Sequence, residues 1–139
     1  MKANELMIGD WVCIDEPDKY AGATGQIQSL MNHREDDAAY FNIFIQGKFG
    51  YVLRGVCSDD IRPIPLTPEI LEKNGFKEYD GLYYRLDIAE DVFVNAVFTS
   101  EEPFASVYNT HYMARPICKY LHQLQHALRL CGIDKTIEL

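Results

Sequence analysis

The length, composition and charge of this chain predict a folded protein and disfavour several functional classes. Of its 139 residues, 47% are hydrophobic and 24% are charged, which supplies a core and argues against intrinsic disorder. The formal net charge of −8 repels phosphate backbones and makes nucleic acid an unfavourable partner. No stretch approaches the roughly 18 apolar residues of a membrane span, and the first residues lack a signal-peptide pattern, so we expect a cytoplasmic protein without a membrane partner.

The first part of the chain has the pattern of a small all-β domain. Four short segments are rich in strand-forming residues, namely 11–14, 26–30, 40–45 and 51–56. Gly47 and Gly50 suit a tight turn, so residues 40–51 are expected to form one hairpin. The acidic stretch 33–37 lacks the spacing of a calcium loop and is expected to be an exposed loop. Four to five such strands predict a small barrel.

Two prolines mark a domain boundary. Pro63 and Pro65 hold the backbone extended and exclude helix before each of them. The boundary predicts two domains, residues 1–64 and residues 65–139. The first contains 6 basic and 10 acidic residues and the second contains 7 and 11, so each has a net charge of −4.

The second part combines helices and strands. Thr67 as N-cap, Pro68 at the first helical position and Gly75 after the last turn predict a short helix. Three strands are then expected at 82–88, 92–98 and 104–110. The last helix is expected to begin near Pro116 and to end at Gly132. Its apolar stripe comprises Ile117, Tyr120, Leu121, Leu124, Ala127, Leu128 and Cys131. The order α-β-β-β-α after a β-barrel gives a mainly β protein of the α+β class.

One face of the second sheet is expected to need a cover. The strand alternation turns Tyr83, Phe93, Val97 and Val107 away from the last helix. We therefore expect either that the two domains pack through this face or that the protein self-associates.

The cysteines and histidines are the candidates for chemistry. Cys13, Cys57, Cys118 and Cys131 are widely separated, which favours reduced, structural thiols. Cys118, His122 and His126 are spaced four apart, so on one helix they would face the same side and form a weak metal-site candidate. The glutamate and third ligand of a zinc-protease helix are missing. A thiol nucleophile at Cys118 or Cys57, activated by a histidine, is the related enzymatic alternative. Neither cysteine has a recognisable nucleophile context, so we assign no catalytic residue and no cofactor.

Aromatic residues of the first domain are the better candidates for binding. Trp11, Tyr20 and Tyr51 are the proposed contact residues, because small barrels bind partners through aromatic side chains between their loops. The loop before Tyr20 contains Glu16, Pro17 and Asp18, which suits a basic or proline-containing peptide better than a nucleic acid. The alternative is that Trp11 fills the barrel core.

Two resemblances extend this interpretation. The segments 9–12 and 22–30 resemble the opening of an SH3-like barrel of the KOW type, which implies protein or nucleic-acid binding. The basic residues usual in the KOW turn are replaced here by 21–24, Ala-Gly-Ala-Thr. A family of small uncharacterised proteins from gut Bacteroidetes and their phages or mobile elements resembles this chain in segments 1–6, 8–12, 64–71, 75–76 and 119–125. That resemblance implies that Leu121–Gln125 is a shared feature, in which His122 and Gln123 contact a partner or form hydrogen bonds within the fold.

Together these observations predict a non-enzymatic protein-binding or adaptor module of a phage or mobile element. Its partner would be another protein or a second copy of the chain. A nucleic-acid-associated factor that binds through the barrel is the alternative. A metal-dependent or thiol enzyme is the second alternative.

Overall fold

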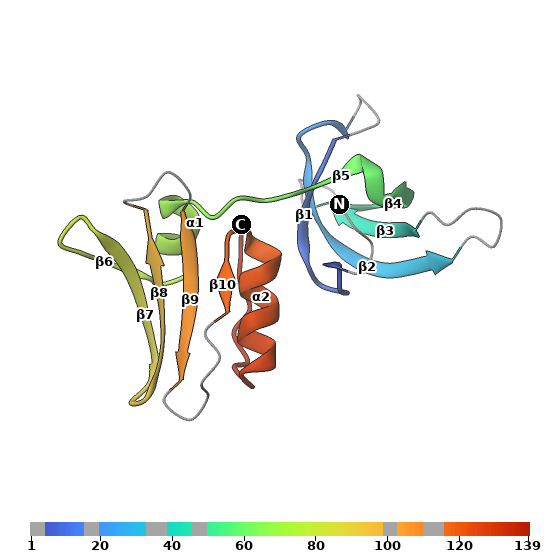
Figure 1. The fold of residues 1–139 in the computed structure, drawn as a ribbon. Helices are drawn as coiled ribbons and strands as arrows, with labels where there is room; N and C mark the ends of the chain where they lie inside the picture. Colours follow the sequence, from blue (N-terminus) through green and yellow to red (C-terminus); the bar gives the residue numbers. More distant parts are fainter. Residues whose placement is uncertain (1–4, 16–19, 33–38, 46–49, 99–102, 110–115) are drawn as a thin grey trace. The chain divides into compact units, whose positions relative to one another are not determined.

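A computed structural model divides the chain into two compact units (Figure 1). The described residues are 5–15, 20–32, 39–45, 50–98, 103–109 and 116–139. The units are Met1–Ile64 and Pro65–Leu139, so the division lies between Pro63 and Pro65, where the backbone is held extended. Each unit contains one antiparallel sheet, and the chain is a mainly β protein of the α+β class.

The first unit is a five-stranded antiparallel sheet. Its strands are β1 (Trp11–Ile14), β2 (Thr24–Asn32), β3 (Ala39–Ile45), β4 (Tyr51–Cys57) and β5 (Ile61–Pro63). A 3-10 turn, η3 (Ser58–Asp60), leads from β4 into β5. The strand order is β4-β3-β2-β1-β5, so β4 and β5 are edges and the sheet does not close into the expected barrel. The short β5 ends at Pro63, which has no N–H to extend the ladder.

The expected hairpin over residues 40–51 is confirmed. β3 pairs with β4, with Tyr40 opposite Cys57 and Ile45 opposite Tyr51. The turn residues 46–49 and the acidic stretch 33–37 lie outside the described residues.

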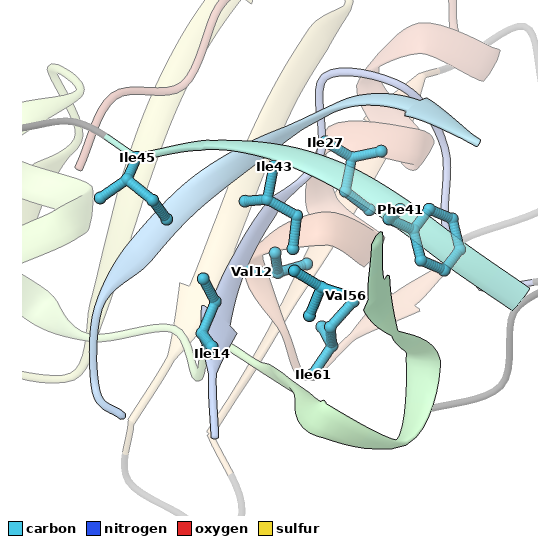
Figure 2. Packing of buried hydrophobic residues seen from close by; sticks show 8 residues of the cluster. All are labelled: Val12, Ile14, Ile27, Phe41, Ile43, Ile45, Val56 and Ile61. Carbon is cyan, nitrogen blue, oxygen red and sulfur yellow. The ribbon is translucent and has the colours of Figure 1, made fainter. Parts of the chain in front are cut away.

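The core of the first unit is aliphatic apart from Phe41 and lies on one side of the sheet (Figure 2). Its members come from all five strands and are labelled in Figure 2: Val12, Ile14, Ile27, Phe41, Ile43, Ile45, Val56 and Ile61. Val12, Ile14 and Ile43 are fully buried. Each such side chain contributes about 2 kcal/mol through burial.

The Gly9-Asp10 pair of the first motif builds a turn. Gly9 has φ +86°, a left-handed conformation that a side chain would disfavour. The backbone N–H of Met7 donates to Asp10 Oδ2 at 2.8 Å. The N–H of Ile27 donates to the carbonyl of Asp10 at 3.0 Å, which fixes the turn to β2. These residues therefore have a structural role at the entry to β1.

The second unit also contains a five-stranded antiparallel sheet. One helix precedes its strands in the sequence and another follows them. Its elements are α1 (Pro68–Lys73), β6 (Lys77–Tyr79), β7 (Tyr83–Ala89), β8 (Val92–Val97), β9 (Phe104–Asn109), β10 (Ile117–Cys118) and α2 (Leu121–Leu130). The strand order is β10-β9-β8-β7-β6. The two outer strands, β6 and β10, are additions to the expected α-β-β-β-α order. None of the helices in the described ranges is long and apolar enough to cross a membrane.

Local capping signals place α1 as expected. Thr67 Oγ1 accepts a hydrogen bond from the N–H of Ile70 at 3.3 Å, and Pro68 follows at the first helical position. Hydrogen bonds from the backbone N–H of Glu69 and from the Thr67 side chain lower the pKa of Glu69. Gly75, with φ +83°, follows the helix. The predicted start and end are therefore confirmed.

The start of α2 differs from the expectation. The helix begins at Leu121, because Gln123 Oε1 accepts hydrogen bonds from the N–H groups of Lys119 (2.8 Å) and Tyr120 (3.3 Å) and caps it there. Ile117 and Cys118 lie before the cap and pair with β9 as β10. Consequently Ile117, at 66% exposure, is not part of the buried stripe of the helix.

The sheet faces of the second unit also require one correction. Val107 lies opposite Val94, and both are buried with Ala96 and Ala105. Since cross-strand partners share a face, Val107 belongs to the buried face and not to the face that carries Phe93. α2 lies against β9 and β10 and buries Leu121, Leu124 and Leu128.

The carboxyl-terminal segment is held by a buried asparagine. Asn74 Nδ2 donates to the carbonyls of Ile70 and Glu138, each at 2.7 Å, and Asn74 Oδ1 accepts from the N–H of Glu138 at 2.8 Å. Asn74 is 7% exposed and the neighbouring Ile137 is 2% exposed. These bonds pin the segment while Ile137 anchors it by burial.

We expect Asn74→Ala to lower the free energy of unfolding by about 2 kcal/mol, because partly buried backbone groups lose their hydrogen bonds. Urea denaturation followed by circular dichroism measures this loss. The control is Thr136→Ala, at an exposed position of the same segment, with an expected change within about 0.5 kcal/mol. Equal stabilities for the two variants would contradict the anchoring role of Asn74.

Candidate functional site

Two of the three proposed aromatic contact residues lie together in the first unit. The ring centroids of Tyr20 and Tyr51 are 5.8 Å apart, with the planes inclined by 47°. Tyr51 is the first residue of β4 and is 44% exposed. Tyr20 is half-buried against the aliphatic core, and its carbonyl accepts a hydrogen bond from the N–H of Ala23 at 2.8 Å. This hydrogen-bonded turn holds the backbone of Tyr20 in place. The ring of Tyr20 in turn packs against the exposed ring of Tyr51.

Trp11 is not available to a partner, contrary to the expectation. It is 2% exposed. Because side chains alternate along β1 and Val12 and Ile14 belong to the aliphatic core, Trp11 lies on the opposite side of the strand. It is therefore a buried side chain, although it is not part of the core shown in Figure 2.

Three carboxylates of the first unit lie where β1 ends and on η3, before β5 begins. Asp15 follows β1, and its N–H donates to the carbonyl of Asp60 at 2.8 Å. Arg62 Nη2 lies 2.8 Å from Asp15 Oδ1, in a largely solvent-exposed ion pair. Asp59 is exposed beside Asp60 on η3. Residues 1–64 carry a net charge of −4 (6 basic, 10 acidic).

β4 beside Tyr51 has an accessible edge that sequence reasoning missed. Tyr51 and Val52 are consecutive and are 44% and 46% exposed, so both faces of the strand are accessible at this end. A register shift follows, where the N–H of Gly55 donates to Asn42 Oδ1 at 3.3 Å. Asn42 Nδ2 in turn donates to Ser29 Oγ at 2.9 Å. In the sequence, the corresponding feature is the pair of adjacent apolar residues Tyr51 and Val52, and the structure shows that both are exposed.

His122 and Gln123 have roles inside the second unit. The Gln123 side chain is the N-terminal cap of α2. His122 is 3% exposed, and its ring stacks on Tyr120 at 6.0 Å and meets the edge of His126 at 5.8 Å. Both side chains therefore make contacts in the fold, which fits the intramolecular alternative considered for them.

The proposed metal face is not formed as one helical surface. Cys118 lies on β10, before α2 begins, so the helical spacing to His122 and His126 does not apply. In the described ranges, no group of three histidine, cysteine, aspartate or glutamate side chains is placed to hold a metal ion. Burial raises the pKa of the Cys118 thiol to about 12, with a smaller effect from Cys131. This shift opposes formation of the thiolate that metal binding or nucleophilic attack requires.

All four cysteines are free thiols, and one of them lies at a cavity. Cys131 lines an open cavity of about 530 Å³ together with Leu86, Ile88, Val92 and Ile133. The described lining residues include no histidine. The imidazole of a Cys–His pair is therefore not among them, and the titratable lining residues besides Cys131 are Asp87, Asp134 and Lys135.

The second sheet carries an aromatic stack on its other face. The rings of Phe93 and Tyr108 are parallel within 9° and 4.8 Å apart, and Arg85 Cζ lies 3.9 Å from the centre of Phe93. Since β8 lies between β7 and β9, these groups cover both faces of the Phe93 ring. Arg85 Nε also donates to Asp87 Oδ1 at 2.7 Å. A nucleic-acid base would have to displace these contacts before it could stack on Phe93.

The Tyr20–Tyr51 pair and the adjoining edge of β4 are therefore the candidate site. They combine an exposed tyrosine with an edge strand, in a unit whose net charge is −4 over residues 1–64 (6 basic, 10 acidic). No protein-family model, curated protein or solved structure matches this chain.

Proposed function

We propose that the protein is a non-enzymatic protein-binding module whose first unit binds a peptide segment of its partner at Tyr20 and Tyr51. The observation that carries this proposal is the contact between the two rings, with Tyr51 44% exposed on a fixed strand. Tyrosine offers a large contact area at a low cost in conformational entropy and is enriched at binding hot spots. The aromatic pair therefore suits recognition better than it suits catalysis.

Charge supports a protein partner over a nucleic acid. The net charge of −8 would oppose the counterion-release term that drives nucleic-acid binding. The carboxylates of Asp15, Asp59 and Asp60 instead favour a peptide with basic residues.

A random peptide library displayed on phage tests this function. We expect the wild-type protein to select peptides, and we expect Tyr51→Ala to weaken their binding at least tenfold, as for a hot-spot tyrosine. The control is Tyr79→Ala in the second unit, because Tyr79 is 38% exposed and likewise contacts another tyrosine, Tyr83. It should leave binding unchanged.

Two results would contradict the proposal. One is a library selection that enriches no peptide on the wild-type protein. The other is equal weakening by Tyr51→Ala and Tyr79→Ala, which would place the contact elsewhere. Circular dichroism of each variant confirms that it is folded before its binding is compared.

A further inference from the structure

We infer that the partner segment binds as an additional β-strand on the free edge of β4, along Tyr51–Leu53. This inference rests on the protein-binding function proposed above and adds the mode of binding. In strand addition, main-chain hydrogen bonds supply affinity and alternate side chains supply specificity.

The edges of the two sheets differ in length. β5, β6 and β10 contain 3, 3 and 2 residues, whereas β4 contains 7. Very short edge strands and prolines are the usual protection against pairing with another chain, and β5 has both. β4 has neither, and among the described strands only β3 pairs with it. Within the part of the chain that the structure describes, its outer edge is therefore open to a further strand.

The register defines where a strand can add. Tyr51, Val52 and Leu53 pair regularly with β3, opposite Ile45, Phe44 and Ile43. The irregularity at Arg54 and Gly55 follows, and Gly55 has φ +68°. A bulge of this kind increases the local twist and interrupts regular pairing. The added strand should therefore be short and should end before Gly55.

Side chains on both faces of β4 define the occupant. Tyr51 projects on the same face as Leu53, which packs against the core, and Val52 projects on the other face. An added strand would place one side chain beside the Tyr20–Tyr51 pair and the next beside Val52. Apolar residues at alternate positions would gain contacts on both faces.

Charge distinguishes a foreign segment from a second copy. Two first units would bring together two surfaces of net charge −4 each (6 basic, 10 acidic), which opposes edge-to-edge pairing. A peptide with basic flanking residues would be attracted to the same surface. Arg54 is the one basic residue of β4, so the partner residue nearest to it should be neutral or acidic. The occupant is therefore an extended, proline-free, predominantly basic peptide segment.

Backbone N-methylation of a library-selected peptide tests this inference. Each residue of the peptide is methylated in turn, which removes one N–H donor without changing the side chain. In strand addition only alternate N–H groups face β4, so alternate positions should weaken binding at least tenfold and the intervening positions less than about twofold. Amide hydrogen exchange should also slow at least tenfold at those N–H groups of Tyr51–Leu53 that point away from β3 when the peptide binds, and not in β6, the control edge.

The outcomes separate the binding mode from the function. A peptide that depends on Tyr51 but tolerates N-methylation at every position would overturn strand addition and leave the protein-binding function standing. Selection of no peptide would overturn both. Light scattering that shows a dimer, converted to monomer by Val52→Lys while the fold is retained, would identify a second copy as the occupant and would overturn the peptide assignment.

Discussion

Cys118 is expected to react with iodoacetamide about a thousandfold more slowly in the native protein at pH 8 than an ordinary thiol does. Burial raises its pKa from 9.0 to about 12. At pH 8 the thiolate fraction then falls from about one tenth to about one ten-thousandth, and the thiolate is the reactive form. The 1% exposure of the side chain also restricts access of the reagent.

Native alkylation followed by peptide mass spectrometry measures this difference. Cys131, half-buried in the same unit, is the internal comparison. Urea should bring the two rates together, because unfolding removes the burial. Cys131→Ser should leave Cys118 slow, since burial is the larger cause of its raised pKa. Native alkylation of Cys118 as rapid as that of Cys131 would contradict the prediction and would favour the thiol chemistry considered from the sequence.

The same shift predicts a change of stability with pH. The pKa of Cys118 is higher in the folded state than in the unfolded state, so the unfolded chain loses the proton first as the pH rises. This group therefore lowers the free energy of unfolding above pH 9, by about 1.4 kcal/mol between pH 7 and pH 10. Urea midpoints at the two pH values, compared between the wild type and Cys118→Ala, isolate the contribution of this thiol.

The sequence predicted elements that are specified by local signals. α1 begins at Pro68 because Thr67 caps it, and both signals lie within a few residues of each other. The β3–β4 hairpin and strands β7 to β9 follow from alternation and turn residues in the same way. Such signals do not depend on the rest of the fold.

Elements that depend on distant partners were harder to predict. Ile117 continues the apolar spacing of α2, yet it forms β10 because β9 offers hydrogen bonds and Gln123 caps the helix after it. The closure of the first sheet likewise depends on whether two distant strands, β4 and β5, meet. No local pattern in either strand specifies that.

The candidate site was predictable in its residue types and not in its geometry. Tyr20 and Tyr51 have the aromatic side chains expected of a contact surface, but their 5.8 Å separation results from the tertiary structure. Trp11 has the same aromatic character and is buried. Composition does not indicate which side of β1 it occupies, or what covers that side.

Gly25→Ala is expected to lower the free energy of unfolding of the first unit by about 3 kcal/mol. A Cβ atom at position 25 would lie 2.6 Å from Ile43 Cγ2, 2.6 Å from the carbonyl oxygen of Phe44 and 2.9 Å from Ile45 Cδ1. Gly25 lies in β2 between its partners Val12 and Ile45. Alanine normally gains stability over glycine by restricting the unfolded chain, and this overlap outweighs that gain.

Gly22→Ala is the matched control. Gly22 precedes the same strand, but its backbone conformation favours glycine and its surroundings do not. Its φ is +82°, and a Cβ there would have no atom within 4 Å. Only the left-handed backbone opposes alanine, at a cost of about 1 kcal/mol. Urea denaturation followed by the fluorescence of Trp11, the one tryptophan of the chain, reports the unfolding of this unit for both variants.

A second substitution separates the obstacles at Gly25. Ile45→Val removes the Cδ1 atom that a new Cβ would meet, but it leaves the two nearer atoms, Ile43 Cγ2 and the carbonyl oxygen of Phe44, in place. Adding it to Gly25→Ala should therefore restore little of the lost stability, since a backbone atom in the β2–β3 ladder cannot move aside as a flexible side-chain end can. Full rescue would show that crowding by Ile45 Cδ1 alone requires glycine at position 25. Without rescue, the obstacles that remain, Ile43 Cγ2 and the carbonyl oxygen of Phe44, are the reason why β2 requires glycine at position 25.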